Sequence, residues 1–318
     1  MLGVGSGAGR SGKVRKIVKN GLQAWYKCDT TQAPLGEEEV ANGDFSLGLD
    51  IVLNGSFGSS TNWSTHGSGV SFSNGEVVIP INSENDNVGI YQENVFTNAK
   101  TYKIIIKAKG SASFTANLLE TQGAASEQAI SNIALTTSYQ EFTIYHTAQG
   151  TNDIFIQRLA GHEPGKSQTI FVENISIQQT NPNDSWLPQD STWTIKDGYA
   201  EYTDGGGAKY ISPNRFNNTN STDFLTSGKK YKLSFTIEGT SARMGIFRGS
   251  SEALINYDYY TTGDYEVEFK AASTGDIRFY GHDDSTGNFK ISNVSVKEIT
   301  NSVRDYSKNN NNAVLYSG

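Results

Sequence analysis

Short runs in which apolar and polar residues alternate recur along most of the 318-residue chain. In the run Tyr265–Lys270, every second residue is aromatic or Val and the residues between them are charged. A period of two places successive side chains on opposite faces of a strand, so each run predicts a strand with one buried and one wet face. Because no long helical pattern separates the runs, we expect an all-β chain of antiparallel strands.

The order of these runs is repeated along the chain. Runs begin at Tyr102, Tyr139, Asp153 and Phe171, and similar runs begin at Tyr231, Tyr265, Asp276 and Phe289. The offset between matching positions falls slowly, from 129 residues (Tyr102 to Tyr231) to 119 residues (Asn174 to Asn293), as short loop deletions would produce. Two hairpin signals, Asn74-Gly75 and Asp197-Gly198, match at an offset of 123 residues. The pattern therefore predicts two similar modules in tandem.

These patterns divide the chain into four parts. Residues 1–41 are expected to form a basic Gly-rich arm and a first strand, and residues 301–318 a C-terminal strand segment. Between them, residues 42–180 and 181–300 are expected to fold as two tandem antiparallel jelly-roll β-sandwiches. Two near-identical turns, Asn42–Phe45 and Asn54–Phe57, stand at the head of the first module.

Basic residues are concentrated in the N-terminal arm. They are Arg10, Lys13, Arg15, Lys16 and Lys19, with no acidic residue before Asp29. We predict an assembly arm that orders on an acidic neighbouring subunit, and simple disorder is the alternative. The stretch Gly7–Lys13 approaches a phosphate-binding loop, but Val14 replaces the Ser or Thr that would hold magnesium, and no strand precedes it.

Composition and charge exclude several classes of protein. The net charge of −7 and the pI of about 5.2 disfavour nucleic acid as a partner, because phosphate binding needs concentrated positive charge. Cys28 is the only cysteine, so neither an intrachain disulfide nor a multi-cysteine zinc site is available. No run is long and apolar enough for membrane insertion, and the basic start lacks the apolar middle of a signal peptide.

The sequence does not nominate an active site or a metal site. His162-Glu163 lacks a second His at helical spacing, and Pro164 would break the helix that a zinc protease needs. His282-Asp283-Asp284 has metal-binding side chains, but an Asp pair before Ser-Thr-Gly is typical of a solvated turn. Cys28 lies in an aromatic run that is typical of a core. We therefore expect no catalytic residue, no metal and no enzyme activity.

Exposed aromatic rings beside polar groups are the candidates for ligand binding. Tyr257 and Tyr259 lie on one face of a predicted strand, with Asp258 on the other. Trp186 and Trp193, at the entrance to the second module, are further candidates. Core packing or a subunit contact is the alternative for all four rings. Trp63 is predicted to cap the core of the first module.

The residues quoted above resemble a known family. The Asn-Gly-x-Phe turns, the Tyr-x-Ile/Leu strands and the closing runs Glu173–Ile177 and Ser292–Val296 resemble the carbohydrate-binding-module-like, galactose-binding-like jelly rolls, over most of residues 42–299. Calcium in that family uses carboxylates where this chain has Ser46, Gly58, Asn174 and Asn293. Since neutral amides are weak ligands for calcium, the resemblance does not favour a family-type calcium site, and no cofactor is expected.

The two ends of the chain carry a second resemblance. The segments Gly21–Asp29 and Val303–Gly318 look like neighbouring strands of concanavalin-like or laminin-G-like domains, so we expect them to pair with each other or with a neighbouring chain. The combination resembles virion structural proteins of tailed bacteriophages. It implies a non-enzymatic decoration or fibre-associated protein in the virion, a homo-oligomer with other virion proteins and cell-surface glycans as partners. The alternative function is a pair of carbohydrate-binding modules from a glycan-degrading system.

Overall fold

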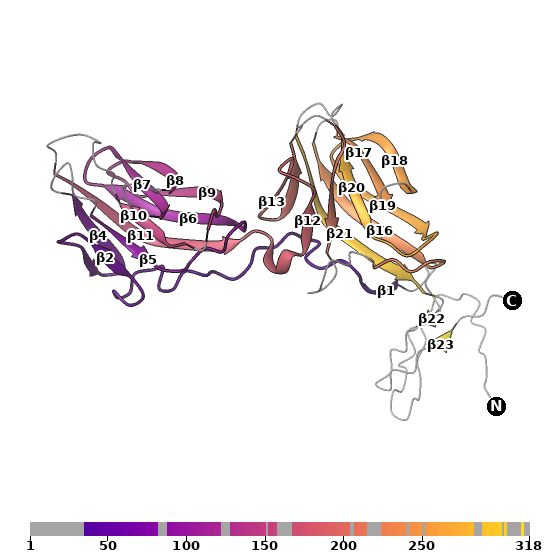
Figure 1. Ribbon diagram of the computed structural model, residues 1–318, viewed down its shortest axis with the longest axis horizontal. Helices are drawn as coiled ribbons and strands as arrows, with labels where there is room; N and C mark the ends of the chain where they lie inside the picture. Colours follow the sequence, from indigo (N-terminus) through magenta and orange to yellow (C-terminus); the bar gives the residue numbers. More distant parts are fainter. Residues whose placement is uncertain are drawn as a thin grey trace, which may run out of the picture. The chain divides into compact units, whose positions relative to one another are not determined.

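The computed structural model describes residues 35–81, 88–121, 128–150, 152–157, 167–203, 207–214, 224–239, 242–249, 252–282, 288–300, 302–303 and 313–314, and the statements below concern these residues. Most of them form two β-sandwiches, each built from antiparallel sheets around its own apolar core (Figure 1). This confirms the prediction of an all-β chain with two antiparallel jelly-roll sandwiches.

Sandwich 1 consists of two five-stranded sheets. One has the order β2-β5-β10-β7-β8 and the other β3-β4-β11-β6-β9. Their strands are β2 (Ser64–His66), β3 (Ser71–Ser73), β4 (Glu76–Ile81), β5 (Gly89–Gln92), β6 (Thr101–Gly110), β7 (Phe114–Thr121), β8 (Gln128–Leu135), β9 (Gln140–Thr147), β10 (Ile154–Gln157) and β11 (Gln168–Gln179). Trp63 is buried in this core, as predicted, and the predicted hairpin turn joins β3 to β4.

Sandwich 2 repeats this arrangement, and its strands β12 to β21 correspond in order to strands β2 to β11 of sandwich 1. The sheet orders are β12-β15-β20-β17-β18 and β13-β14-β21-β16-β19, with β1 added beside β21. The strands are β1 (Leu35–Glu38), β12 (Trp186–Pro188), β13 (Trp193–Lys196), β14 (Tyr199–Tyr202), β15 (Lys209–Pro213), β16 (Lys230–Glu238), β17 (Ala242–Arg248), β18 (Glu252–Tyr260), β19 (Gly263–Lys270), β20 (Ile277–Gly281) and β21 (Phe289–Ile299). A short 3-10 helix, η1 (Pro182–Asp184), precedes β12.

The two Asn-Gly-x-Phe turns belong to different sandwiches. Phe57 lies in the core of sandwich 1, but Phe45 lies in the core of sandwich 2, where its ring stacks on Trp186 with centroids 4.5 Å apart. In Figure 1 the indigo strand β1 accordingly lies beside the yellow strand β21. The expected boundary at residue 42 is therefore corrected. Sandwich 1 is inserted into sandwich 2 after the opening turn of sandwich 2.

Both turns dock in the same way. The Trp186 Nε1 donates a hydrogen bond to the carbonyl of Asn42 (2.9 Å), and the Trp63 Nε1 donates one to the carbonyl of Asn54 (3.1 Å). The next carbonyl of each turn accepts from the closing strand, Gly43 from Val294 N (2.8 Å) and Gly55 from Ile175 N (2.9 Å). A Cβ at Gly43 or Gly55 would lie about 2 Å from the Val294 or Ile175 carbonyl oxygen, so both turns need glycine.

The chain enters and leaves sandwich 1 at one place. Gly48 N donates to the carbonyl of Gln179 (2.9 Å), and the Gln178 side chain donates back to the carbonyl of Gly48 (2.9 Å). Asp50 then bridges to Gln178 and accepts hydrogen bonds from Val52 N and Ile177 N through its carboxylate. Two paired segments, rather than one linker, therefore connect the sandwiches.

The ends of the chain are described only in part. Strands β22 (Ser302–Val303) and β23 (Ala313–Val314) pair with each other in a two-stranded sheet. Both strands lie within the C-terminal strand segment that was predicted over residues 301–318. Trp25, Cys28 and the basic residues of the arm lie outside the described residues, so the pairing of the two end segments and the assembly arm stay predictions.

A buried carboxylate organises one end of sandwich 1. Glu120, on β7, is fully buried and accepts hydrogen bonds from Gln149 N (2.9 Å), Gly150 N (3.0 Å) and the Asn152 amide (2.7 Å). The His146 Nε2 lies 2.7 Å from Glu120 Oε2, and it carries the proton because a carboxylate only accepts. Burial raises the pKa of Glu120, but these hydrogen bonds outweigh it and leave the pKa below the usual 4.5.

We expect Glu120 to make sandwich 1 sensitive to acid. Because its pKa is lowered on folding, the carboxylate stabilises the fold above pH ~4.5, and this stability is lost as the pH falls through the folded-state pKa. In Glu120→Gln, the side-chain NH2 group would face backbone N–H donors. We expect this to lower the free energy of unfolding by about 1–3 kcal/mol at pH 7. Urea unfolding at pH 7 and pH 4 should show a smaller pH effect for Glu120→Gln than for wild type. Glu173→Gln, at an exposed ion pair of the same sandwich, is the matched control.

Candidate ligand-binding face

The two tryptophans that were candidates for ligand binding are core residues. Trp186 is fully buried and Trp193 is 2% exposed. The indole N–H of Trp193 donates to the carbonyl of Lys209 (2.9 Å), and its ring packs against Tyr202 and Phe289. Since neither indole presents a face to solvent, these two positions are corrected to structural roles. Their N–H groups explain why tryptophan is used there, because each satisfies a backbone carbonyl.

The two tyrosines lie on the solvent side of sandwich 2, as the alternation predicts. Tyr257 is half-buried and Tyr259 is 56% exposed, both on β18. Neighbouring strands bring further rings and cations to the same side of the sheet. We call this group the aromatic face, and it consists of Tyr210 on β15, Arg243 and Phe247 on β17, Tyr257 and Tyr259 on β18, Arg278 and Tyr280 on β20, and His282 just after β20.

Strand register sets the order of groups across the face. Tyr210 pairs with Tyr280, and Tyr280 pairs with Gly245 on the other side, so these three form a row across the sheet. The Tyr210 and Tyr280 rings are 5.2 Å apart, and Phe247 and Tyr257 close over Gly245 at 5.2 Å from each other. A Cβ at Gly245 would lie 2.6 Å from the Phe247 ring, so glycine lets the rings lie close to the sheet.

Arg278 is fixed at one end of the face. Its Nε donates to Asp276 Oδ2 (2.7 Å), and its guanidinium lies over the Tyr210 ring, 4.5 Å from the centroid. Burial lowers the pKa of Arg278, but the hydrogen bonds with Asp276 and Tyr280 outweigh burial and raise it. Arg278 therefore stays charged, and its guanidinium makes a cation–π contact with the Tyr210 ring.

Arg243 lies at the other end, beside the exposed tyrosine. Its guanidinium is 5.8 Å from the Tyr257 ring centroid and 5.9 Å from the Tyr259 centroid. Its Nη1 is 3.1 Å from His282 Nδ1, and since a guanidinium only donates, this ring nitrogen is the acceptor and the imidazole N–H is on Nε2. The pKa of Tyr257 is raised, mainly by burial, with Tyr280 adding to the shift and Arg243 opposing it. The face thus combines ring surfaces with N–H donors.

Comparison with solved structures finds carbohydrate-binding modules that resemble parts of this chain at low sequence identity. No protein-family model matches, and no curated protein is similar. A tandem of two family 22 carbohydrate-binding modules from Paenibacillus barcinonensis Xyn10C is 9% identical over 85% of this chain and 99% of its own length, with a TM-score of 0.29. The N-terminal cellulose-binding domain of Cellulomonas fimi β-1,4-glucanase C is 19% identical over 37% of this chain and 88% of its own, with a TM-score of 0.32. A family 29 carbohydrate-binding module is 15% identical over 42% of this chain and 87% of its own length, with a TM-score of 0.32.

Sandwich 1 has a sheet, β2-β5-β10-β7-β8, that corresponds to the sheet bearing the aromatic face of sandwich 2, but its surface carries different residues. In sandwich 1, Gln157 pairs with Gly89 on one side and with Asn117 on the other. This row corresponds to the row of Tyr210, Tyr280 and Gly245 in sandwich 2. Gln157 and Asn117 are fully buried, and Asn117 donates to the exposed Asn132 (2.6 Å). Tyr91 stacks on Phe155, which is 7% exposed. At this sheet, the described residues therefore form an aromatic, cationic face on sandwich 2 and a different surface on sandwich 1.

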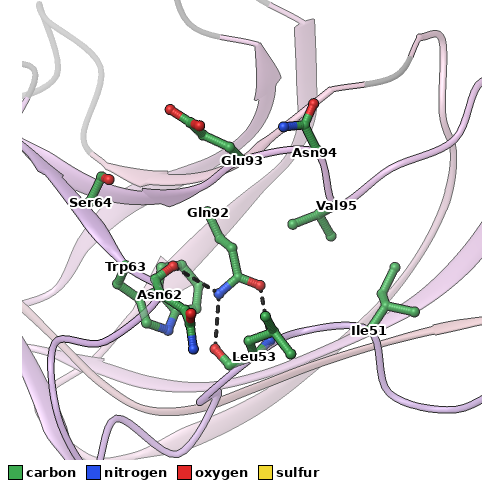
Figure 2. Close-up of a pocket in the computed structure, with 9 residues that line it drawn as sticks. All are labelled: Ile51, Leu53, Asn62, Trp63, Ser64, Gln92, Glu93, Asn94 and Val95. Atoms are coloured by element: carbon green, nitrogen blue, oxygen red, sulfur yellow. Dashed lines mark hydrogen bonds between the residues drawn. The ribbon is translucent and has the colours of Figure 1, made fainter.

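Sandwich 1 has a pocket of its own, near its opening turn. Figure 2 shows this pocket, about 620 Å³ in volume and lined by residues from the Ile51–Leu53 segment, from Asn62–Ser64 and from Gln92–Val95. The side-chain amide of Gln92 already has hydrogen-bond partners within the protein. Its Nε2 donates to the carbonyls of Leu53 and Asn62, and its Oε1 accepts from Leu53 N. A smaller pocket of about 440 Å³ occupies the corresponding place on sandwich 2. These pockets therefore arise from the fold, and Trp63, the aromatic residue that lines the first pocket, is only 6% exposed.

Other chemistry suggested by the sequence is not assembled in the described residues. Within them, no three His, Cys, Asp or Glu side chains cluster closely enough to hold a metal ion. His282 contacts Arg243 and Tyr257, while Asp283 and Asp284 lie outside the described residues, as does His162-Glu163. No described helix is long and apolar enough to cross a membrane. Tyr210, Phe247, Arg243 and Tyr280 were not singled out from the sequence, although Arg278, Tyr280 and His282 alternate visibly with buried residues.

Proposed function

We propose that this chain is a non-catalytic carbohydrate-binding protein whose ligand stacks on the aromatic face of sandwich 2. The observation that carries the proposal is Tyr259, a 56% exposed ring held beside Arg243 at the edge of a continuous cluster of aromatic side chains. Sugar rings offer C–H groups to aromatic faces and hydroxyl groups to nearby donors, and this surface supplies both partners. A large aromatic surface on the solvent side of a sheet is otherwise costly to leave exposed.

Tyr259→Ala is expected to weaken glycan binding about tenfold, because about 1.4 kcal/mol of stacking is lost. A glycan array followed by titration calorimetry measures this. Tyr259 is a sharper probe than Tyr257, because Tyr257 also packs against Phe247 and His282 and its removal disturbs the cluster. The matched control is Tyr145→Ala, which removes a 36% exposed tyrosine from sandwich 1. The proposal fails if no saccharide binds, or if both variants lose binding equally.

Attachment to a bacteriophage particle is a separate proposal. It rests on the basic, Gly-rich start of the chain with Arg10, Lys13, Arg15, Lys16 and Lys19, and on the resemblance in style to virion proteins. Residues of the arm lie outside the described part of the chain, so this proposal draws on the sequence alone. The two proposals are compatible, since a particle-bound protein with a glycan-binding face would attach the particle to a cell surface.

A further inference from the structure

Three asparagines in the described turns are followed by glycine, namely Asn42, Asn54 and Asn74, and a fourth, Asn20, lies outside the described residues. Because glycine has no side chain, its backbone nitrogen is open to bond with the side-chain carbonyl carbon of the preceding asparagine, which begins deamidation. The asparagine must first swing toward the backbone, so hydrogen bonds that hold its side-chain amide oppose the reaction. The surroundings of each turn therefore decide which asparagine reacts.

The asparagines of the two opening turns are held by their side-chain amides. Asn42 Nδ2 donates to the carbonyl of Ser46 (3.2 Å), and Asn42 Oδ1 accepts from Ser46 N (2.9 Å) and Ser46 Oγ (2.9 Å). Asn54 Nδ2 donates to the carbonyl of Ser59 (2.8 Å), and Asn54 Oδ1 accepts from Gly58 N (3.2 Å). Each amide would have to break at least two hydrogen bonds before its carbonyl carbon could be attacked.

Asn74 differs from both of these asparagines. With Gly75 it forms the two-residue turn that joins β3 to β4, and both residues have positive φ (56° and 75°). Its side chain is exposed and has no hydrogen-bond partner among the described residues. We infer that Asn74 is a site of spontaneous deamidation and that it reacts in preference to Asn42 and Asn54.

The reaction needs only the chain and water. The Gly75 nitrogen loses its proton and bonds to the side-chain carbonyl carbon of Asn74, while the bond from that carbon to Nδ2 breaks and ammonia leaves with the proton. Water then opens the five-membered imide at one of its two carbonyl groups, and no atom is oxidised or reduced. The product is aspartate or isoaspartate, and in isoaspartate the backbone gains the former side-chain methylene.

Isoaspartate at this turn would release an edge strand of sandwich 1. Strand β3 ends its sheet and pairs with β4, whereas β4 also pairs with β11. The two-residue turn sets the register of β3 against β4, so an extra backbone carbon breaks that register. The new carboxylate also lies two positions from Glu76, which has the same charge. We therefore expect β3 to detach and β4 to stay in the sheet.

Incubation of the full chain at neutral and mildly alkaline pH, followed by peptide mapping with mass spectrometry, measures the reaction at each site. Asn74 should convert about tenfold faster, or more, than Asn42 and Asn54, because the hydrogen bonds of these two amides must break first. In urea, where those bonds are absent, the three sites should convert at similar rates. Equal rates in the folded chain would overturn the inference, as would an unchanged Asn74 over a time in which the unfolded chain converts.

A pair of variants tests the effect on the strand. Asn74→Gln keeps an amide but must form a six-membered ring, which closes far more slowly, so peptides from β3 should keep their protection from hydrogen exchange after incubation. The matched control is Asn98→Gln, at an exposed asparagine of the same sandwich that alanine follows. This control should lose β3 protection at the wild-type rate. Full protection of β3 in the purified isoaspartate form would overturn the expected release of the strand.

Discussion

A chain that begins at residue 47 is expected to lose the fold of sandwich 2 and to keep that of sandwich 1. The deletion removes Phe45 and Val40, which are buried in the core of sandwich 2, and leaves the Trp186 indole N–H and Val294 N without their carbonyl partners. Losing a buried Phe side chain alone costs about 3–5 kcal/mol, and a whole domain is stable by only about 5–15 kcal/mol. The remaining contacts are therefore insufficient.

Hydrogen exchange resolves the two sandwiches in one experiment. Peptides from β16 should lose protection in the shortened chain, while peptides from β6 should keep it. The matched control keeps residues 35–48 and replaces residues 49–178 by Asn-Gly, a favourable two-residue turn between Gly48 and Gln179, which already share a hydrogen bond. This control should retain a folded sandwich 2 without sandwich 1. Full protection of β16 in the chain from residue 47 would contradict the nested arrangement.

Gly43→Ala is expected to destabilise sandwich 2 by about 3 kcal/mol or more, and Gly55→Ala to do the same to sandwich 1. The added Cβ would lie 1.8 Å from the Val294 carbonyl oxygen in the first variant and 2.0 Å from that of Ile175 in the second. Neither oxygen can yield, because each belongs to the backbone of a closing strand at the centre of a sheet. The turn must instead lift away and break its hydrogen bond to that strand.

Thermal and urea unfolding measure the loss of stability in each variant, and hydrogen exchange should assign it to sandwich 2 in Gly43→Ala and to sandwich 1 in Gly55→Ala. Gly58→Ala is the control within the same turn region, because its Cβ would meet only the Asn54 side chain, at 3.8 Å. That change should be close to neutral, or stabilising by about 0.4–1 kcal/mol through the unfolded state. Stability of Gly43→Ala within about 0.5 kcal/mol of wild type would show that the turn does not dock as described.

Local patterns predicted the fold because they act over a few residues. Alternation located the long strands, and Asn74-Gly75 and Asp197-Gly198 located two hairpins correctly. The nesting was missed because Trp186 follows Phe45 by 141 residues, whereas Trp63 follows Phe57 by six. The sequence did contain one signal of the nested arrangement. Two opening turns stand before the first module, and none stands before the second.

The candidate site was predicted only where one strand supplies it. Tyr257 and Tyr259 share a face by simple alternation, but their neighbours Arg243, His282 and Tyr280 come from other strands, and strand pairing is not encoded locally. Trp186 and Trp193 were misjudged because a large ring with one donor suits a ligand surface and a core equally well. Their burial depends on residues far along the chain, including Phe45.

The paired segments at Gly48 and Gln179 bear on how the protein folds during synthesis. The ribosome makes the opening turn of sandwich 2 first, and that turn has no partner until more than 130 further residues have emerged. Once sandwich 1 folds, it holds Gly48 against Gln179 and so closes this long loop in advance. A folded sandwich 1 is therefore expected to lower the entropic cost of bringing the opening turn of sandwich 2 to the strands with which it packs.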